Sequence, residues 1–300
     1  MPTRRLILAF AALAALGRVS AGRARDRLRA VATFSILGDL VKNVGGEHAE
    51  VATLVGPNGD VHVYAPTPAD ARTLAAADVV FVNGLGLEGW LDRLIAASGS
   101  KAPVVVASVG IHPREITDER GSNRLVGDPH AWQSVANAEI YVANIRDGLI
   151  AADPAGKESY QANAAAYLAT LDALDREIKA AIAAIPADRR KIITAHKAFG
   201  YFGDAYGLNF IAPEGASTDA EPSARDVANI ITQIRVQKIA AVFMENITDP
   251  RLMQRIAAET GAKMGGTIYS DALSPPNGPA ATYIDMMRHN VHEFQHALTS

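Results

Sequence analysis

The chain has 300 residues, of which 49% are hydrophobic and 20% charged, a composition that excludes a disordered or coiled-coil protein and allows two domains. It contains no cysteine, which excludes disulfides, thiolate metal ligands and a lipidated cysteine. The formal net charge of −3 argues against nucleic acid as a partner.

The first 21 residues have the pattern of a secretory signal peptide. Arg4 and Arg5 precede an apolar run from Leu6 to Leu16, and small residues up to Ala21 follow it. The run is too short for a permanent membrane span. Its removal lowers Lys plus Arg from 29 to 26 against 32 acidic residues, a net charge of −6. We expect a periplasmic protein without a lipid anchor, exported by either the general or the twin-arginine route.

Apolar, β-rich segments then alternate with helical ones, which is typical of parallel strands joined by helical crossovers. In the first half the expected strands are Ala30–Phe34, Val51–Val55, Val79–Val82 and Val104–Ala107, and the expected helices are Ile36–Val44, Pro68–Ala77, Glu88–Ala97 and Gln133–Ala151. In the second half the expected strands are Lys191–Thr194, Asn209–Ala212, Ala240–Met244 and Lys263–Ile268. The fold class is therefore α/β, with two lobes built on parallel sheets.

One long helix is expected between the lobes, over Pro154–Ile185. Its apolar residues recur at steps of three and four, so one face is buried. Asp153 is the expected N-cap, and Pro186 ends the run. Such a helix spans roughly 48 Å, enough to join two lobes. The expected organisation is a signal peptide (1–21), an N-terminal lobe (22–152), a linking helix (153–186) and a C-terminal lobe (187–300).

Four side chains that suit a metal ion each follow one of the predicted strands. They are His62, His130, His196 and Asp271. Open α/β sheets bind ligands beyond the carboxyl ends of their strands, so all four can converge between the lobes. The alternative for each is an ordinary loop residue, because scattered histidines lack a diagnostic local spacing.

Several segments closely resemble the metal-specific solute-binding proteins of bacterial ABC importers, the zinc- and manganese-uptake group. They are Gly56–Asp70, Ala77–Leu91, Gly127–Trp132, Thr194–Phe202 and Tyr269–Leu273. The resemblance implies two α/β lobes joined by a rigid helix, with one metal at the interface held by His62, His130, His196 and Asp271. It also implies delivery to a membrane permease and no enzymatic reaction; we further expect a monomer, with a metallochaperone as a further partner to consider.

Three imidazoles and one carboxylate suit Zn2+, whereas Mn2+ prefers more oxygen ligands. Manganese- and iron-binding members of the group tend to have glutamate where this chain has His196. We therefore expect Zn2+ as the transported ligand, with Mn2+ or iron as the alternative. Many zinc-specific members carry a histidine-rich loop before the second ligand, but the corresponding stretch here, Ile111 to Val126, contains only His112.

Two enzyme hypotheses compete with transport. His292, Glu293 and His296 match H-E-x-x-H, the motif of zinc metalloproteases, but too few residues follow to supply a third ligand. A zinc-dependent hydrolase with Glu245 as base is the other hypothesis; a fourth protein ligand would occupy the position that catalytic zinc keeps for water. Glu245 is then a structural carboxylate or one that supports a ligand.

Two tryptophans and a glycine-rich loop are assigned to packing or turns. Trp90 is expected in the core and Trp132 behind the metal site. The glycines between Asn83 and Gly89 match neither G-x-G-x-x-G nor a P-loop, so no nucleotide site is expected.

Overall fold

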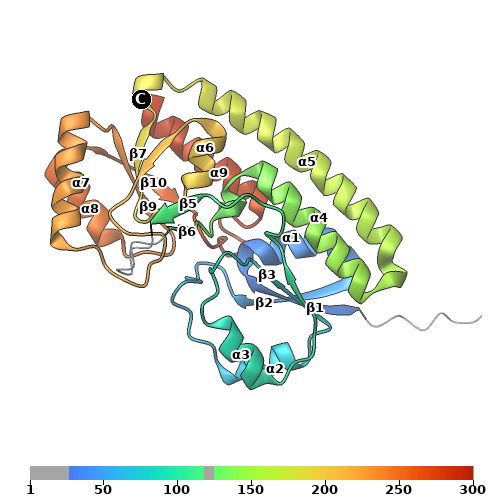
Figure 1. Ribbon diagram of the computed structural model, residues 1–300. Helices are drawn as coiled ribbons and strands as arrows, with labels where there is room; N and C mark the ends of the chain where they lie inside the picture. Colours follow the sequence, from blue (N-terminus) through green and yellow to red (C-terminus); the bar gives the residue numbers. More distant parts are fainter. Residues whose placement is uncertain (1–26, 118–124, 300) are drawn as a thin grey trace, which may run out of the picture.

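The computed structural model describes residues 27–117 and 125–299, and these form two lobes that each contain a four-stranded parallel sheet (Figure 1). The predicted α/β class with parallel sheets and a long linking helix is confirmed. The expected signal peptide, residues 1–21, lies outside the described residues. None of the described helices is both long enough and apolar enough to cross a membrane.

The N-terminal lobe has the strand order β2-β1-β3-β4. Its elements are β1 (Leu28–Phe34), α1 (Ser35–Gly45), β2 (Ala49–Val55), α2 (Pro68–Ala75), β3 (Val79–Val82), α3 (Leu91–Ser98), β4 (Val104–Val106) and α4 (Val135–Ala152). In the register of the sheet, Ala30 of β1 lies between Val51 of β2 and Val79 of β3. Helices α1 and α4 pack on the sheet, and α2 and α3 pack together below it in Figure 1.

The C-terminal lobe repeats this design with the order β10-β9-β7-β8. Its elements are β7 (Lys191–Ile193), α6 (Gly200–Tyr206), β8 (Asn209–Ile211), α7 (Ala224–Gln237), β9 (Ala241–Glu245), α8 (Pro250–Thr260), β10 (Lys263–Ile268) and α9 (Tyr283–Thr299). Helices α7 and α8 cover the outer face of the sheet, whereas α6 and α9 lie on the side of the long helix (Figure 1). In both lobes the expected strands are present with boundaries shifted by two residues at most.

The long helix α5 spans Lys157–Ala183. It begins later than predicted, because Pro154–Gly156 forms a separate 3-10 turn whose N-cap is Asp153. The expected side-chain cap is absent there, and the Asp153 carboxylate accepts a hydrogen bond from the Tyr160 hydroxyl at 2.9 Å. At 1.5 Å per residue the helix is roughly 40 Å long. Figure 1 shows it running along both lobes.

One apolar core continues through both lobes beneath α5. The buried face of α5, which includes Leu171, Leu174 and Ile178, belongs to the same cluster as Phe81 in the N-terminal sheet and Phe294 in α9. The helix contacts α1 and α4 on one side and α6 and α9 on the other. Because interiors are close-packed, this shared core resists rotation of one lobe against the other.

A short antiparallel hairpin was not predicted. It is formed by β5 (Glu115–Thr117) and β6 (Leu125–Gly127), each three residues long. Strands of this length leave too little alternation in the sequence to be recognised.

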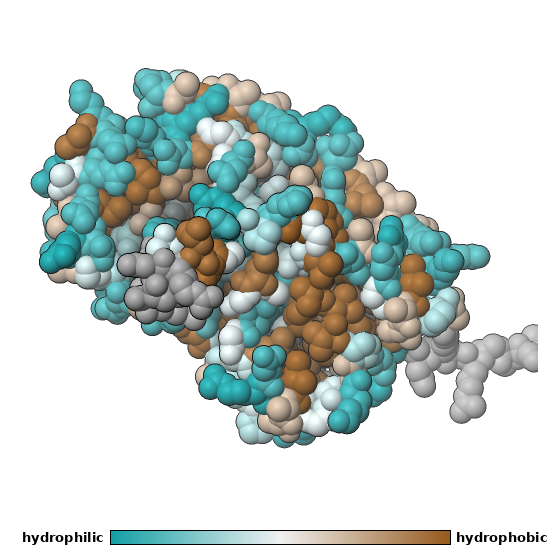
Figure 2. All heavy atoms as spheres, viewed as in Figure 1, coloured by the Kyte–Doolittle hydropathy of each residue, from teal (hydrophilic) through white to brown (hydrophobic). Residues whose placement is uncertain are grey.

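Figure 2 shows that the viewed face is mostly hydrophilic with apolar patches on both lobes. Leu125 of β6 is among the exposed large apolar residues.

Candidate metal centre

The four predicted residues come from four different segments beyond the carboxyl ends of the strands. His62 lies in the loop after β2, and His130 follows β6. His196 lies after β7, and Asp271 lies after β10. Parallel strands bring the loops of His62, His196 and Asp271 to the carboxyl edges of the two sheets, whereas His130 lies between the antiparallel β5–β6 pair and α4. The structure therefore brings together all four residues that the sequence singled out.

Their ligand atoms converge on one point, all lying within 4.8 Å of one another. His62 Nε2 is 3.3 Å from His130 Nε2 and 3.1 Å from Asp271 Oδ2. His196 Nε2 is also 3.1 Å from Asp271 Oδ2. A tetrahedron with metal–ligand bonds of 2.0–2.1 Å has edges of about 3.3 Å, so this spacing suits a single small cation.

His130 is oriented by a buried carboxylate two residues before it. Asp128 Oδ1 lies 2.8 Å from His130 Nδ1 and also accepts a hydrogen bond from the His130 backbone N–H at 3.0 Å. A carboxylate accepts only, so Nδ1 carries the proton. In the neutral imidazole, Nε2 then presents its lone pair to the cluster.

His196 is oriented in the same way by Glu245, the last residue of β9. Glu245 Oε2 lies 2.6 Å from His196 Nδ1. Its other oxygen accepts the backbone N–H groups of Ala195 and His196 at 2.8 and 3.0 Å. Both oxygens of Glu245 are thus engaged in holding the His196 loop, which argues against its use as a catalytic base.

The carboxylates of the cluster stabilise positive charge at its centre. Burial lowers the pKa of His130, but the carboxylates of Asp271 and Asp128 outweigh this effect and raise it to about 9. Burial opposes the charged form of His196 as well, yet Glu245 and Asp271 hold its pKa well above the usual range. Burial would raise the pKa of Asp271, but His196 and His130 keep it well below the ordinary value. Protons on these imidazoles therefore compete with a metal ion.

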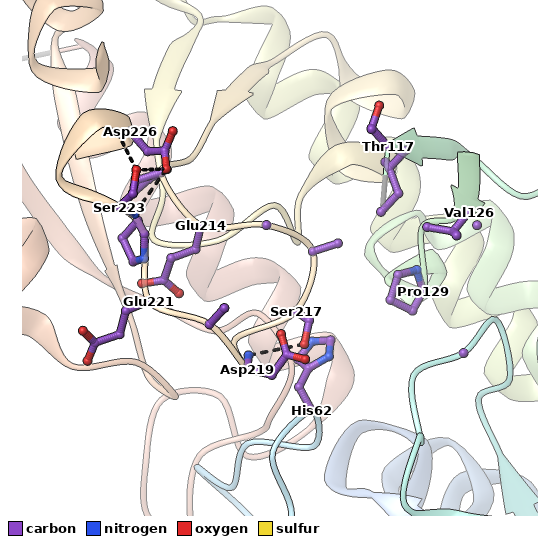
Figure 3. Close-up of a pocket in the computed structure, with 18 of the residues that line it drawn as sticks. His62, Thr117, Val126, Pro129, Glu214, Ser217, Asp219, Glu221, Ser223 and Asp226 are labelled. Carbon is purple, nitrogen blue, oxygen red and sulfur yellow. Dashed lines mark hydrogen bonds between the residues drawn. The ribbon is translucent and has the colours of Figure 1, made fainter. Parts of the chain in front are cut away.

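A cavity of about 440 Å³ leads from His62 toward the surface between the lobes. Figure 3 shows Glu214, Ser217 and Asp219 on one side of it and Thr117, Val126 and Pro129 on the other. Burial raises the pKa of Glu214 to about 7. The acidic side chains along this opening give a cation a favourable approach to the four residues.

Both tryptophans lie where they were expected. The Trp132 ring meets the His130 ring edge-on at 5.3 Å between centroids, and its Nε1 donates to Ser270 O at 3.0 Å. Trp90 is buried, and its Nε1 donates to Val61 O at 2.8 Å. Trp132 thus packs behind the cluster, and Trp90 supports the chain next to His62.

The other motifs do not join this centre. His292 and His296 lie on the exposed side of α9 with ring centroids 6.4 Å apart, and neither belongs to the group of four. In the glycine-rich loop, the amides of Asn83 and Gly84 donate to the carboxylate of Glu88 at 2.6 and 3.2 Å. The side chain of Glu88 therefore closes the loop, and α3 begins after it, at Leu91.

Sequence reasoning missed the role of Asp128. Its position two residues before His130, in Asp-Pro-His, was a usable indication, because an aspartate readily accepts from the backbone N–H two residues on. The sequence predicted Glu245 to be a structural carboxylate or one that supports a ligand, but nothing in the sequence links it to His196. That pairing depends on the order of β7 and β9 in the sheet.

The chain is similar to known metal-binding proteins along almost its whole length. The family model described as "Zinc-uptake complex component A periplasmic" matches residues 30–297. The manganese-binding lipoprotein MntA of Halalkalibacterium halodurans is 36% identical, covering 98% of this chain and 97% of the relative. The iron-binding protein YfeA of Yersinia pestis is 34% identical, over 95% and 92% of the two chains.

Solved structures agree with the fold. The manganese-bound periplasmic metal-binding protein of Candidatus Liberibacter asiaticus has a TM-score of 0.80 and 30% identity, covering 91% of this chain and all of that one. The periplasmic zinc-binding protein TroA of Treponema pallidum has a TM-score of 0.85 and 29% identity, covering 91% and 99%. This chain therefore belongs to the family of zinc-uptake complex component A periplasmic proteins, and it is a divalent-metal-binding solute-binding protein of an ABC importer, not an enzyme.

Proposed function

We propose that the protein captures Zn2+ in the periplasm and delivers it to the membrane permease of its importer, with His62, His130, His196 and Asp271 as the ligands. The observation that carries this proposal is the convergence of three Nε2 atoms and the Asp271 carboxylate, with ligand atoms within 4.8 Å of one another. The carboxylates against His130 Nδ1 and His196 Nδ1 are the arrangement that metal-ligating histidines normally have.

The donor set favours zinc on chemical grounds. Three imidazole nitrogens and one carboxylate match the borderline character of Zn2+ and its preference for four ligands. Three of the separations between ligand atoms are 3.1–3.3 Å, close to the edges of such a tetrahedron, and all of them are within 4.8 Å.

Manganese or iron is the second candidate, and one observation supports it beyond the names of the relatives. Asp271 Oδ1 is buried and lies 3.6 Å from His130 Nε2, without an ordinary hydrogen bond to any described residue. A carboxylate that offers both oxygens raises the coordination number, which suits the harder Mn2+. The metal choice of this chain thus depends on whether Asp271 binds through one oxygen or two.

The ligand assignment is tested by His130→Ala. We expect zinc affinity to fall by more than about 100-fold, because loss of a ligand exceeds the 10–100-fold effect of its supporting partners. His112→Ala, at an exposed histidine outside the cluster, is the matched control. The measurement is a zinc titration against a competing chelator, with thermal melting of the metal-free proteins to verify folding. Equal affinities for the two variants would remove His130 from the site.

The preference for zinc is tested by His196→Glu, which replaces a nitrogen donor with a harder oxygen donor. Zinc should lose more affinity than manganese, narrowing their affinity ratio by at least about tenfold, equivalent to roughly 1.4 kcal/mol. The order of the two metals need not invert, because zinc remains the stronger binder for a comparable site. A ratio that stays constant or widens would show that His196 does not determine selectivity.

We also propose that the mature protein is a periplasmic monomer. We propose further that it carries no lipid, because the sequence has no cysteine to which a lipid could be attached, although relatives such as MntA are named lipoproteins. Its lobes are proposed to span residues 22–152 and 187–300, with 153–186 as the link. Osmotic-shock fractionation followed by intact-mass analysis tests location, lipid and the cleavage site after Ala21 together.

A further inference from the structure

His62 is held differently from the other candidate ligands. It lies in residues 56–67, a segment without helix or strand. Its side chain is 4% exposed, whereas those of His130, His196 and Asp271 are fully buried. His130 and His196 have carboxylates against their rings, but the hydrogen bond that fixes His62 runs from its backbone N–H to Asp60 Oδ1 at 2.8 Å.

The second oxygen of Asp60 accepts a hydrogen bond from a residue of the C-terminal lobe. Thr218 Oγ1 donates to Asp60 Oδ2 at 2.5 Å, joining segments that are 158 residues apart. Hydrogen bonds to a carboxylate at this length are among the stronger ones. We propose that Asp60 is a positioning residue for metal retention: through its bond to Thr218 it keeps His62 over the bound ion. This inference rests on the proposed function, because it takes His62 as a ligand.

The segment that carries Thr218 has little packing of its own. No residue from 214 to 223 is buried. Its Glu214 and Ala220 border the cavity of about 440 Å³ that His62 also lines, and they border a second cavity, of about 500 Å³, that Asp60 also lines. Figure 3 shows the segment crossing beside His62. A segment with open volume on two sides has few core contacts that hold it in place. The hydrogen bond between Thr218 and Asp60 therefore has a large effect on how this segment and the His62 loop are held together.

The base of the His62 loop is fixed independently of Thr218. Asn58 N donates to Leu273 O at 2.9 Å, and Asn246 Nδ2 donates to Asn58 Oδ1 at 3.0 Å. Loss of the Thr218 bond therefore frees the part of the loop near His62 and leaves its attachment to the C-terminal lobe in place. We expect an effect on metal release without an effect on folding.

The experiment compares Thr218→Val, Thr218→Ser and Thr232→Val. Valine keeps the shape of threonine but removes the hydroxyl, and serine retains it. Thr232 is an exposed residue of α7, and among residues 27–117 and 125–299 its hydroxyl donates to Ala228 O of the same helix, so it is the matched control. Each protein is loaded with Zn2+ alone and mixed rapidly with excess chelator, and the dissociation rate is recorded.

Thr218→Val should release zinc about tenfold faster, the effect of losing one hydrogen bond to a charged group, while the other two variants stay near wild type. In a His62→Ala background, Thr218→Val should change the rate no further. Four results would each overturn the inference. The first is an equal release rate for Thr218→Val and Thr232→Val, and the second is fast release from Thr218→Ser. The third is a further increase in rate when Thr218→Val is added to His62→Ala, and the fourth is a parallel fall in the melting temperature of metal-free Thr218→Val. Failure of the proposed function is distinguishable, because wild-type protein would then not retain zinc at all.

Discussion

His196 Nδ1 lies 2.6 Å from Glu245 Oε2, with both side chains buried at the carboxyl ends of neighbouring strands. The same carboxylate also holds the backbone of residues 195 and 196. The sheet itself therefore fixes the direction in which the imidazole points, and the proton on Nδ1 leaves Nε2 to face Asp271.

Glu245→Gln is expected to weaken zinc binding by about 10–100-fold. The amide either places an N–H group against the N–H of His196 or turns its oxygen away from the backbone donors. Both outcomes disturb the imidazole that should donate to the metal. Chelator-competition titrations at constant pH measure the loss.

The control for this substitution is Glu214→Gln. It removes a half-buried carboxyl group near His196 that is only partly ionised at pH 7, but no hydrogen bond to His196, so a loss of less than about threefold is expected. Equal losses in the two variants would mean that the charge of Glu245 matters and its 2.6 Å contact with His196 Nδ1 does not.

Metal binding should release protons at neutral pH. The pKa of His130 is raised to about 9 in the metal-free protein, mainly by Asp271 against the opposing effect of burial, so its imidazole is protonated at pH 7 and must lose that proton to bind a metal. Affinity is expected to rise about tenfold per pH unit for each proton released, and to keep rising toward about pH 9. An unperturbed imidazole would confine this dependence to the region of about pH 6.5.

Calorimetric titrations with zinc in buffers of different ionisation enthalpy count the released protons. In His130→Ala the count should fall by about one. A wild-type affinity that does not change between about pH 6 and pH 8 would contradict the charge state assigned to the cluster.

The sequence allowed the strands and the four cluster residues to be predicted because both are local. Val79–Val82 and Lys263–Ile268 form strands with the expected bounds, and each cluster residue follows the end of a strand. The supporting contacts were not predictable in this way. Pairs such as Asp60 with Thr218 join residues that are distant in the chain, and only the arrangement of the two sheets brings them together.

The lobes should change their relative orientation little when metal binds. The core that runs from Phe81 through α5 to Phe294 is continuous, and rotation of a lobe would open it. Small-angle scattering with and without zinc should give radii of gyration that agree within about 1 Å, with any movement confined to loops such as the one around His62. A large contraction on zinc binding would show that the lobes close like a hinge.

The histidine pair on α9 should be irrelevant to tight binding. His292→Ala combined with His296→Ala should leave the high-affinity zinc site unchanged, because two histidines on an exposed helix face lack the further ligands that such a site needs. At most one weak zinc should be lost in an equilibrium dialysis measurement. Loss of the tight site, or zinc-dependent peptide cleavage by the wild type, would contradict the transport function.

The most direct test of the central claim is the metal content of the protein as the cell loads it. The protein should be purified from a periplasmic extract without added metal and without chelators, and analysed by elemental mass spectrometry. The account predicts close to one zinc per chain, and a large decrease in the His130→Ala protein prepared in parallel. A protein filled with manganese or iron, or one equally filled in both preparations, would contradict it.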